Sequence, residues 1–74
     1  MRKKLLYPNI YAELARLGLS VSQLADYMGM TSQNLYSKLR GETAINERDM
    51  KTIQEFFKAN GGAFTLDYLF TTNL

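Results

Sequence analysis

Apolar residues recur at the helical period along most of this chain, and glycines or capping residues interrupt them. The first apolar stripe comprises Ile10, Leu14 and Leu17. Because one turn of an α-helix takes 3.6 residues, this spacing predicts a helix that buries one face. Pro8 is tolerated in a first turn, Asn9 is a suitable cap, and Gly18 ends the stripe. We therefore predict a first helix over 9–17.

A second stripe lies shortly before a predicted sharp corner. It comprises Val21, Leu24 and Met28. Ser20 and Gln23 have the spacing of a capping box, and Gly29 can adopt the left-handed conformation that ends a helix. These features predict a helix over 21–28. The small side chain of Ala25 faces the corner, where two helices cross closely at roughly 90–120°.

A short helix is predicted next, over 32–40, with Thr31 as its cap and Gly41 at its end. At ~100° per residue, Leu35 and Leu39 share the face that is expected to be buried. The opposite face contains no acidic residue. It presents Gln33, Asn34, Tyr36, Ser37 and Arg40.

The chemistry of that polar face favours contact with nucleic acid. Amide, hydroxyl and guanidinium groups hydrogen-bond to base edges, and glutamine or asparagine can pair with adenine through two hydrogen bonds. A face that serves only solubility usually mixes acidic residues with basic ones. Helix pairs of this geometry also occur in domains that never bind DNA, so the solvated face remains the alternative.

Two further helices complete a predicted all-α chain of five helices. Asn46, with Asp49 three residues later, starts a helix that continues to about residue 59. Its main stripe comprises Met50, Ile53 and Phe57. After a break at 60–62, Thr65 caps a last turn over 66–70. No segment alternates as a strand would.

The C-terminal part contains more apolar residues than its length requires. They are Phe56, off the main stripe of its helix, and Phe64, Leu66, Tyr68, Leu69, Phe70 and Leu74. Some of them must complete the core against the first helix. The remainder favours a contact between two copies of the chain.

The composition of the chain excludes several kinds of site and leaves nucleic-acid binding possible. A chain of 74 residues forms one small domain, which buries only about 60% of its unfolded surface. The absence of cysteine and histidine excludes disulfides, thiol catalysis and most zinc sites. A net charge of +2 permits nucleic-acid binding without requiring it. No apolar run approaches the ~18–20 residues that span a bilayer, so we expect a cytoplasmic protein.

The segment 20–41 resembles the helix-turn-helix of the Cro and phage-repressor (Xre-like) family, especially its short phage and prophage members. The matching positions are Ala25, Gly29, Thr31, Leu35 and Gly41, and the closing run from Leu66 to Phe70 is also typical. The similarity extends from about 9 to 70. It departs at Val21, where many relatives carry a glutamine that contacts DNA, and at Lys38, where many carry a core aliphatic residue. We expect Leu39 to fill the core instead and the Lys38 ammonium to reach solvent, an acid or a phosphate.

The resemblance implies a compact lambda-repressor-like domain over 1–74, with its core in 7–70, that acts as a transcriptional repressor at an operator. The expected base contacts are Gln33, Ser37, Asn34, Ser32 and Tyr36. The expected contacts to the DNA backbone are Thr31, Ser22, Lys38, Arg40 and Thr43. A homodimer on an inverted repeat would place half-sites ~34 Å apart. No metal, cofactor or small-molecule substrate is expected.

Several alternatives remain open at this point. Tyr36 either touches DNA or packs against the preceding helix. Arg2, Lys3 and Lys4 form either a DNA-binding arm or an ordinary solvated terminus. Glu42, Glu47 and Asp49 are expected to face solvent or to interact with a helix dipole. The rival function is an interaction module, antitoxin-like or antirepressor-like, that does not read DNA. An enzyme is not expected, because the chain has no histidine and no pair of acids on one inward face.

Overall fold

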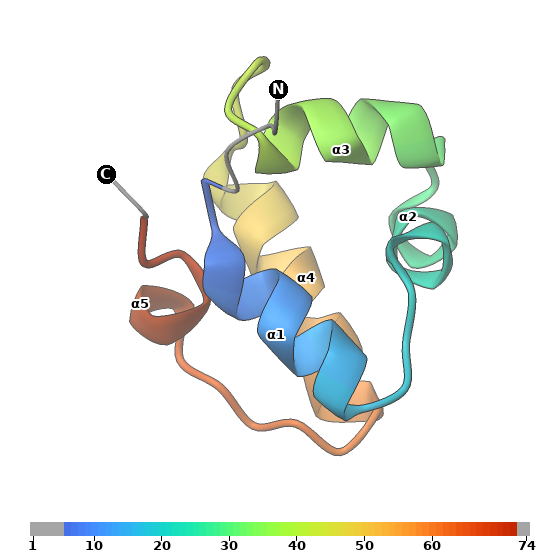
Figure 1. The fold of residues 1–74 in the computed structure, drawn as a ribbon, viewed down its shortest axis with the longest axis vertical. Helices are drawn as coiled ribbons and strands as arrows, with labels where there is room; N and C mark the ends of the chain where they lie inside the picture. The colour runs from blue at the N-terminus through green and yellow to red at the C-terminus, as the bar shows by residue number, and fades with distance from the viewer. Residues whose placement is uncertain (1–5, 73–74) are drawn as a thin grey trace.

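The structure is a computed structural model that describes residues 6–72. Within this range it contains five helices and no strand, as the sequence predicts. The helices are α1 (Pro8–Arg16), α2 (Val21–Met28), α3 (Ser32–Leu39), α4 (Glu47–Ala59) and α5 (Leu66–Leu69). α2 packs against α3 and α4, and α5 packs against α1 and α4, while α3 crosses one end of the molecule (Figure 1). Arg2, Lys3, Lys4 and Leu74 lie outside the described residues.

The core draws buried apolar side chains from all five helices. It comprises Tyr7, Ile10, Leu14, Val21, Leu24, Ala25, Leu35, Leu39, Ile53, Phe56, Phe57 and Leu69. Phe56, off the main stripe of α4, is one of the apolar residues that complete the core: it is only 5% exposed, and its ring centroid lies 5.3 Å from that of Tyr27 in α2. The buried side of α4 is wider than its main apolar stripe, because α2 packs beside α4.

Most of the C-terminal apolar residues also belong to this core or pack against it. Leu69 is fully buried, and Phe64 and Phe70 are half-buried. The Phe64 ring lies 5.5 Å from the Phe57 ring, and the Phe70 ring lies 5.2 Å from the Tyr7 ring. The apolar excess of this segment is therefore used largely within one chain.

Side-chain caps begin four of the five helices at the predicted residues. The capping oxygens are those of Ser20, Thr31, Asn46 and Thr65, each of which accepts a backbone N–H three residues later. The cap predicted for α1 is wrong. Pro8 already occupies the first position of α1, and the Asn9 side chain donates to the carbonyl oxygen of Tyr68 at 2.8 Å. Asn9 therefore joins α1 to α5.

The corner between α2 and α3 has the predicted form. Gly29 lies in the left-handed region with φ of +73°, and the N–H of Met30 donates to the carbonyl oxygen of Ala25 at 3.0 Å. Ala25 is fully buried. The corner thus satisfies the last carbonyls of α2 while it brings the two helices into contact.

One buried acid, which the sequence did not single out, connects α1 to α5. Glu13 is 1% exposed, and its Oε2 accepts a 2.5 Å hydrogen bond from the Tyr68 hydroxyl. Its other oxygen, Oε1, lies 3.5 Å from Nε of Arg16. Oε1 accepts no hydrogen bond within the described residues and Arg16 is largely exposed, so the Tyr68 hydroxyl is the main compensation for burying this carboxylate.

None of the helices in residues 6–72 combines the length and the apolar character that a membrane crossing requires.

We expect Gly29→Ala to lower the free energy of unfolding by about 1–2 kcal/mol, because a left-handed backbone strains any residue with a Cβ atom. A Cβ at Gly29 meets no atom within 4 Å, so strain is the whole effect. Urea denaturation measures the loss. Gly18→Ala is the matched control, with φ of +71° and equally open space, and should lose the same amount. A much larger loss at Gly29 would show that the corner depends on more than backbone conformation.

The Tyr68 hydroxyl should make stability sensitive to alkaline pH. The hydrogen bond to Glu13 and, to a smaller extent, burial raise the pKa of Tyr68 above its ordinary value of 10.0. Because the folded pKa lies above the unfolded one, the stabilisation is complete below pH 10.0 and is lost as the pH rises through the folded pKa. Tyr68→Phe should lower the urea midpoint at pH 7 and flatten its decline at alkaline pH. Equal declines in both proteins would contradict this assignment.

Candidate nucleic-acid interface

The polar side of α3 forms an exposed surface, which we call the outer face and define as Gln33, Asn34, Tyr36, Ser37 and Arg40. Leu35 and Leu39, both fully buried, fix the opposite side of α3 to the core. Of the residues expected to contact bases, only Ser32 lies outside this face. At ~100° per residue, Ser32 lies about 60° from Leu35 and about 40° from Tyr36, at the border between the buried side of α3 and the outer face.

The amide and hydroxyl side chains of the outer face are not used within the described part of the chain. Between residues 6 and 72, the side chains of Gln33, Asn34 and Ser37 form no hydrogen bond or ion pair with one another or with their surroundings. Gln33 and Asn34 are exposed, and Ser37 is half-buried. This state contrasts with Gln23 and Gln54, whose amides bind within the fold.

A hollow opens beside the outer face, between α3 and the segment that follows it. Its volume is about 270 Å³, and it is lined by Met30, Asn34, Ser37, Lys38 and Thr43. Four of these residues are among the predicted DNA contacts. Met30, at the corner before α3, was not among them, because the sequence pattern gave it only a connecting role.

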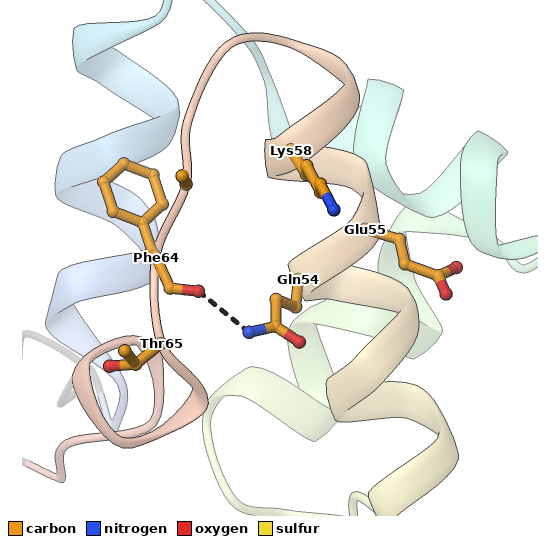
Figure 2. Close-up of a pocket in the computed structure, with 6 residues that line it drawn as sticks. Gln54, Glu55, Lys58, Phe64 and Thr65 are labelled. Atoms are coloured by element: carbon orange, nitrogen blue, oxygen red, sulfur yellow. Dashed lines mark hydrogen bonds between the residues drawn. The ribbon is translucent and has the colours of Figure 1, made fainter.

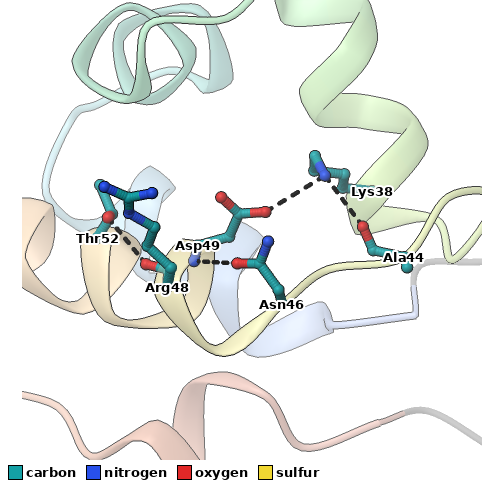
Figure 3. A network of polar contacts seen from close by, with 6 residues as sticks. All are labelled: Lys38, Ala44, Asn46, Arg48, Asp49 and Thr52. Carbon is teal, nitrogen blue, oxygen red and sulfur yellow. Dashed lines mark hydrogen bonds and ion pairs between the residues drawn. The ribbon is translucent and has the colours of Figure 1, made fainter.

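Lys38 links the C-terminal end of α3 to the start of α4 through a hydrogen bond and an ion pair. Its ammonium lies 3.0 Å from the carbonyl oxygen of Ala44 and 3.3 Å from Oδ2 of Asp49, in the first turn of α4 (Figure 3). Both side chains are about one-fifth exposed. Of the three destinations considered for the Lys38 ammonium, the structure shows the acid. Asp49 faces Lys38 and is largely shielded from solvent, and it lies in the first turn of α4, which agrees with the helix-dipole alternative.

Arg40 is held by its neighbours at the C-terminal end of α3. Its Nε lies 2.9 Å from Oε2 of Glu42, and its Nη2 lies 3.2 Å from Oε1, so the contact is bidentate. This contact raises the pKa of Arg40. The guanidinium carbon also lies 5.9 Å from the centre of the Tyr36 ring. Glu42 thus pairs with a predicted DNA contact, which its expected solvent-facing role did not include.

Tyr11 borders this cluster from α1 and was missed by the sequence reasoning. Burial and, next, the nearby Tyr36 raise the pKa of Tyr11, while Arg40 lowers it. Tyr36 of α3 and Arg40 at its C-terminal end are thus near enough to Tyr11 to influence its pKa. Tyr36 itself is 38% exposed. Because Tyr11 lies on the half-buried flank of a short helix, no local pattern distinguishes it from an ordinary core residue.

The remaining predicted backbone contacts lie at helix ends and in the segment after α3. Thr31 is exposed, and its oxygen accepts the N–H of Asn34 at 3.1 Å. Ser22 is exposed in the first turn of α2, and Thr43 is exposed after α3. Helix N-termini present free N–H groups and positive partial charge, which are favourable positions for phosphate.

A second hollow, of about 510 Å³, lies away from this surface, between α4 and the segment 63–65 (Figure 2). Gln54 crosses it and donates to the carbonyl oxygen of Phe64 at 2.9 Å. Its two charged residues, Glu55 and Lys58, are both exposed. Within residues 6–72, no three acidic side chains lie close enough together to hold a metal ion.

The structure thus gathers most predicted DNA contacts around α3 and adds Met30, Tyr11 and Glu42 to them. Comparison of the chain with protein-family models, with curated proteins and with solved structures finds no match.

Proposed function

We propose that this protein is a sequence-specific regulator of transcription that binds double-stranded DNA by inserting α3 into the major groove, in the manner of a phage or prophage repressor. One observation carries the proposal. The side chains of Gln33, Asn34 and Ser37 project from a firmly anchored helix and have no partner within residues 6–72. Such groups are suited to base edges, which supply both donors and acceptors.

The relation of α2 to α3 supports the same proposal. The two helices pack together through a short corner that contains Gly29, with the buried Ala25 at their contact. In a helix-turn-helix, the first helix lies across the DNA backbone and the second lies in the groove. Ser22 and Thr31, at the starts of α2 and α3, would then meet phosphates.

The proposed DNA site is an inverted repeat occupied by two copies of the chain. The longest extent of the protein is 33 Å, close to the ~34 Å between half-sites one helical turn apart. One copy of this size fits one half-site. Because the apolar C-terminal side chains are largely used within the chain, we propose that DNA brings the two copies together. The bacterial nucleoid is the proposed site of action, and no catalytic role is proposed.

A second candidate function rests on the ion pairs that the basic side chains near α3 form within the chain. Lys38 and Arg40 are both paired with carboxylates of the same chain, so the outer face offers less positive charge than its sequence indicates. A nearly neutral polar face also suits a protein partner, as an antitoxin-like or antirepressor-like module would require. Binding to such a partner would persist at high salt, whereas DNA binding would weaken.

Selection of bound duplexes from a random pool, followed by titration at two salt concentrations, tests the proposal as a whole. Recovery of an inverted repeat would support it. Binding without sequence preference, or no binding, would favour the interaction module.

Gln33→Ala should lower affinity for the selected site by about 1–3 kcal/mol and relax the preference at one base pair. The reason is the loss of a bidentate amide contact to a base. Fluorescence anisotropy with the selected duplex and its single-base variants measures both effects. Affinity for an unrelated duplex is the control and should not change. Unchanged discrimination at every position would mean that Gln33 does not face a base.

Arg40→Ala should weaken binding to all sequences alike and reduce the slope of log affinity against log salt by about 1. Glu42→Gln should have the opposite effect, because it releases the Arg40 guanidinium for a phosphate. Glu47→Gln is the matched control, since Glu47 pairs with Lys51 on α4. If Glu42→Gln raises affinity equally in the Arg40→Ala background, Glu42 acts by general repulsion of DNA and not through Arg40.

A further inference from the structure

The hollow beside α3 differs in chemistry from the rest of the outer face. Met30 contributes a half-buried thioether side chain to it, and Thr43 contributes an exposed methyl-bearing side chain. Asn34 and Ser37 line the same hollow from α3. Apolar and hydrogen-bonding groups therefore lie together at the place where α3 would enter a groove.

The hollow is poorly suited to a phosphate. Among the described residues that line it, the one cation is Lys38, whose ammonium lies 3.3 Å from the Asp49 carboxylate and 3.0 Å from the Ala44 carbonyl oxygen (Figure 3). A phosphate placed here would meet a neutralised lysine and the negative charge of Asp49. Phosphate binding gains from cations that are free to replace counterions, and this lysine is not free.

The hollow is better suited to the edge of a base pair that carries a methyl group. In the major groove, the C5-methyl of thymine is the one apolar group among donors and acceptors. Met30 and Thr43 offer it apolar contact. The free amide of Asn34 is placed to bind an adenine through N6 and N7 at the same time.

We propose that this hollow is a specificity site for thymine, in which Met30 and Thr43 contact the C5-methyl while Asn34 pairs with the neighbouring adenine. This inference rests on the proposed DNA-binding function and deepens it. It assigns Met30, which precedes α3, a direct contact with a base of the proposed operator.

Deoxyuridine substitution provides the test, because it removes the methyl group and leaves the base pairing intact. Each thymine of the selected duplex is replaced in turn, and affinity is measured by fluorescence anisotropy. For the wild-type protein, one replacement in a half-site should weaken binding about fourfold, the value of one buried methyl group. For Met30→Ala, the same replacement should change affinity by much less than twofold.

Two further variants keep the test decisive. Thr43→Ser removes only a methyl from an exposed side chain, so it should fold normally and reduce the fourfold effect. Met28→Ala is the matched control: Met28 is a half-buried methionine of α2 that does not line the hollow, and this variant should retain the full effect. Circular dichroism checks the fold of each variant.

The outcomes separate this inference from the proposed function. If the wild-type protein selects an operator but tolerates deoxyuridine at every position, the thymine site is overturned and DNA binding stands. The same conclusion follows if a fourfold loss occurs but persists in both Met30→Ala and Thr43→Ser. If the wild-type protein selects no duplex, the proposed function fails and the inference fails with it.

Discussion

The burial of Leu35 and Leu39 is the contact on which the candidate interface depends. Both side chains are fully buried, and each contributes roughly 1.5–3 kcal/mol through removal from water. They are the two buried residues of α3. Because α3 is short and anchored on one side only, every other side chain must lie at its edges or on its outer face. Ala25 allows α2 to approach closely enough for this anchoring, and Gly29 turns the chain between them.

Carboxylates from outside α3 pair with the basic residues at its C-terminal end and limit the positive charge that these residues offer to a ligand. Asp49 reaches Lys38 from α4, and Glu42 reaches Arg40 from the segment after α3. The two ion pairs differ in how easily a ligand could replace the carboxylate. Lys38 and Asp49 are both about one-fifth exposed, and Lys38 also donates to the carbonyl oxygen of Ala44, so this pair is part of the fold. Glu42 is about half exposed, so a phosphate can compete for Arg40 at little structural cost. For the proposed DNA binding, this pairing favours recognition through neutral polar groups over strong nonspecific attraction to phosphates.

Much of the chain was predictable from local patterns. The bounds of α2 and the caps of four helices follow from residues within one turn of each other, because capping and helix termination are local interactions. The predicted cap at Asn9 failed since a partner distant in sequence, the Tyr68 carbonyl, takes its amide. For Phe56, the sequence left open whether the side chain completes the core or contacts a second copy, and the structure shows it buried beside Tyr27 of α2. Helical periodicity gives the direction of a side chain, and only the neighbouring α2 determines how wide an arc is buried.

The sequence by itself determined five helices, the side-chain caps of four of them, and an α3 whose outer face carries amides and hydroxyls without acids. The tertiary structure decided which carboxylates pair with Lys38 and Arg40, the hollow beside the outer face, and the link from α1 to α5 through Glu13 and Tyr68. The physical reason is the range of the interactions. Periodicity and capping act over three or four residues, whereas ion pairs, buried carboxylates and hollows arise between segments that only the packed core brings together.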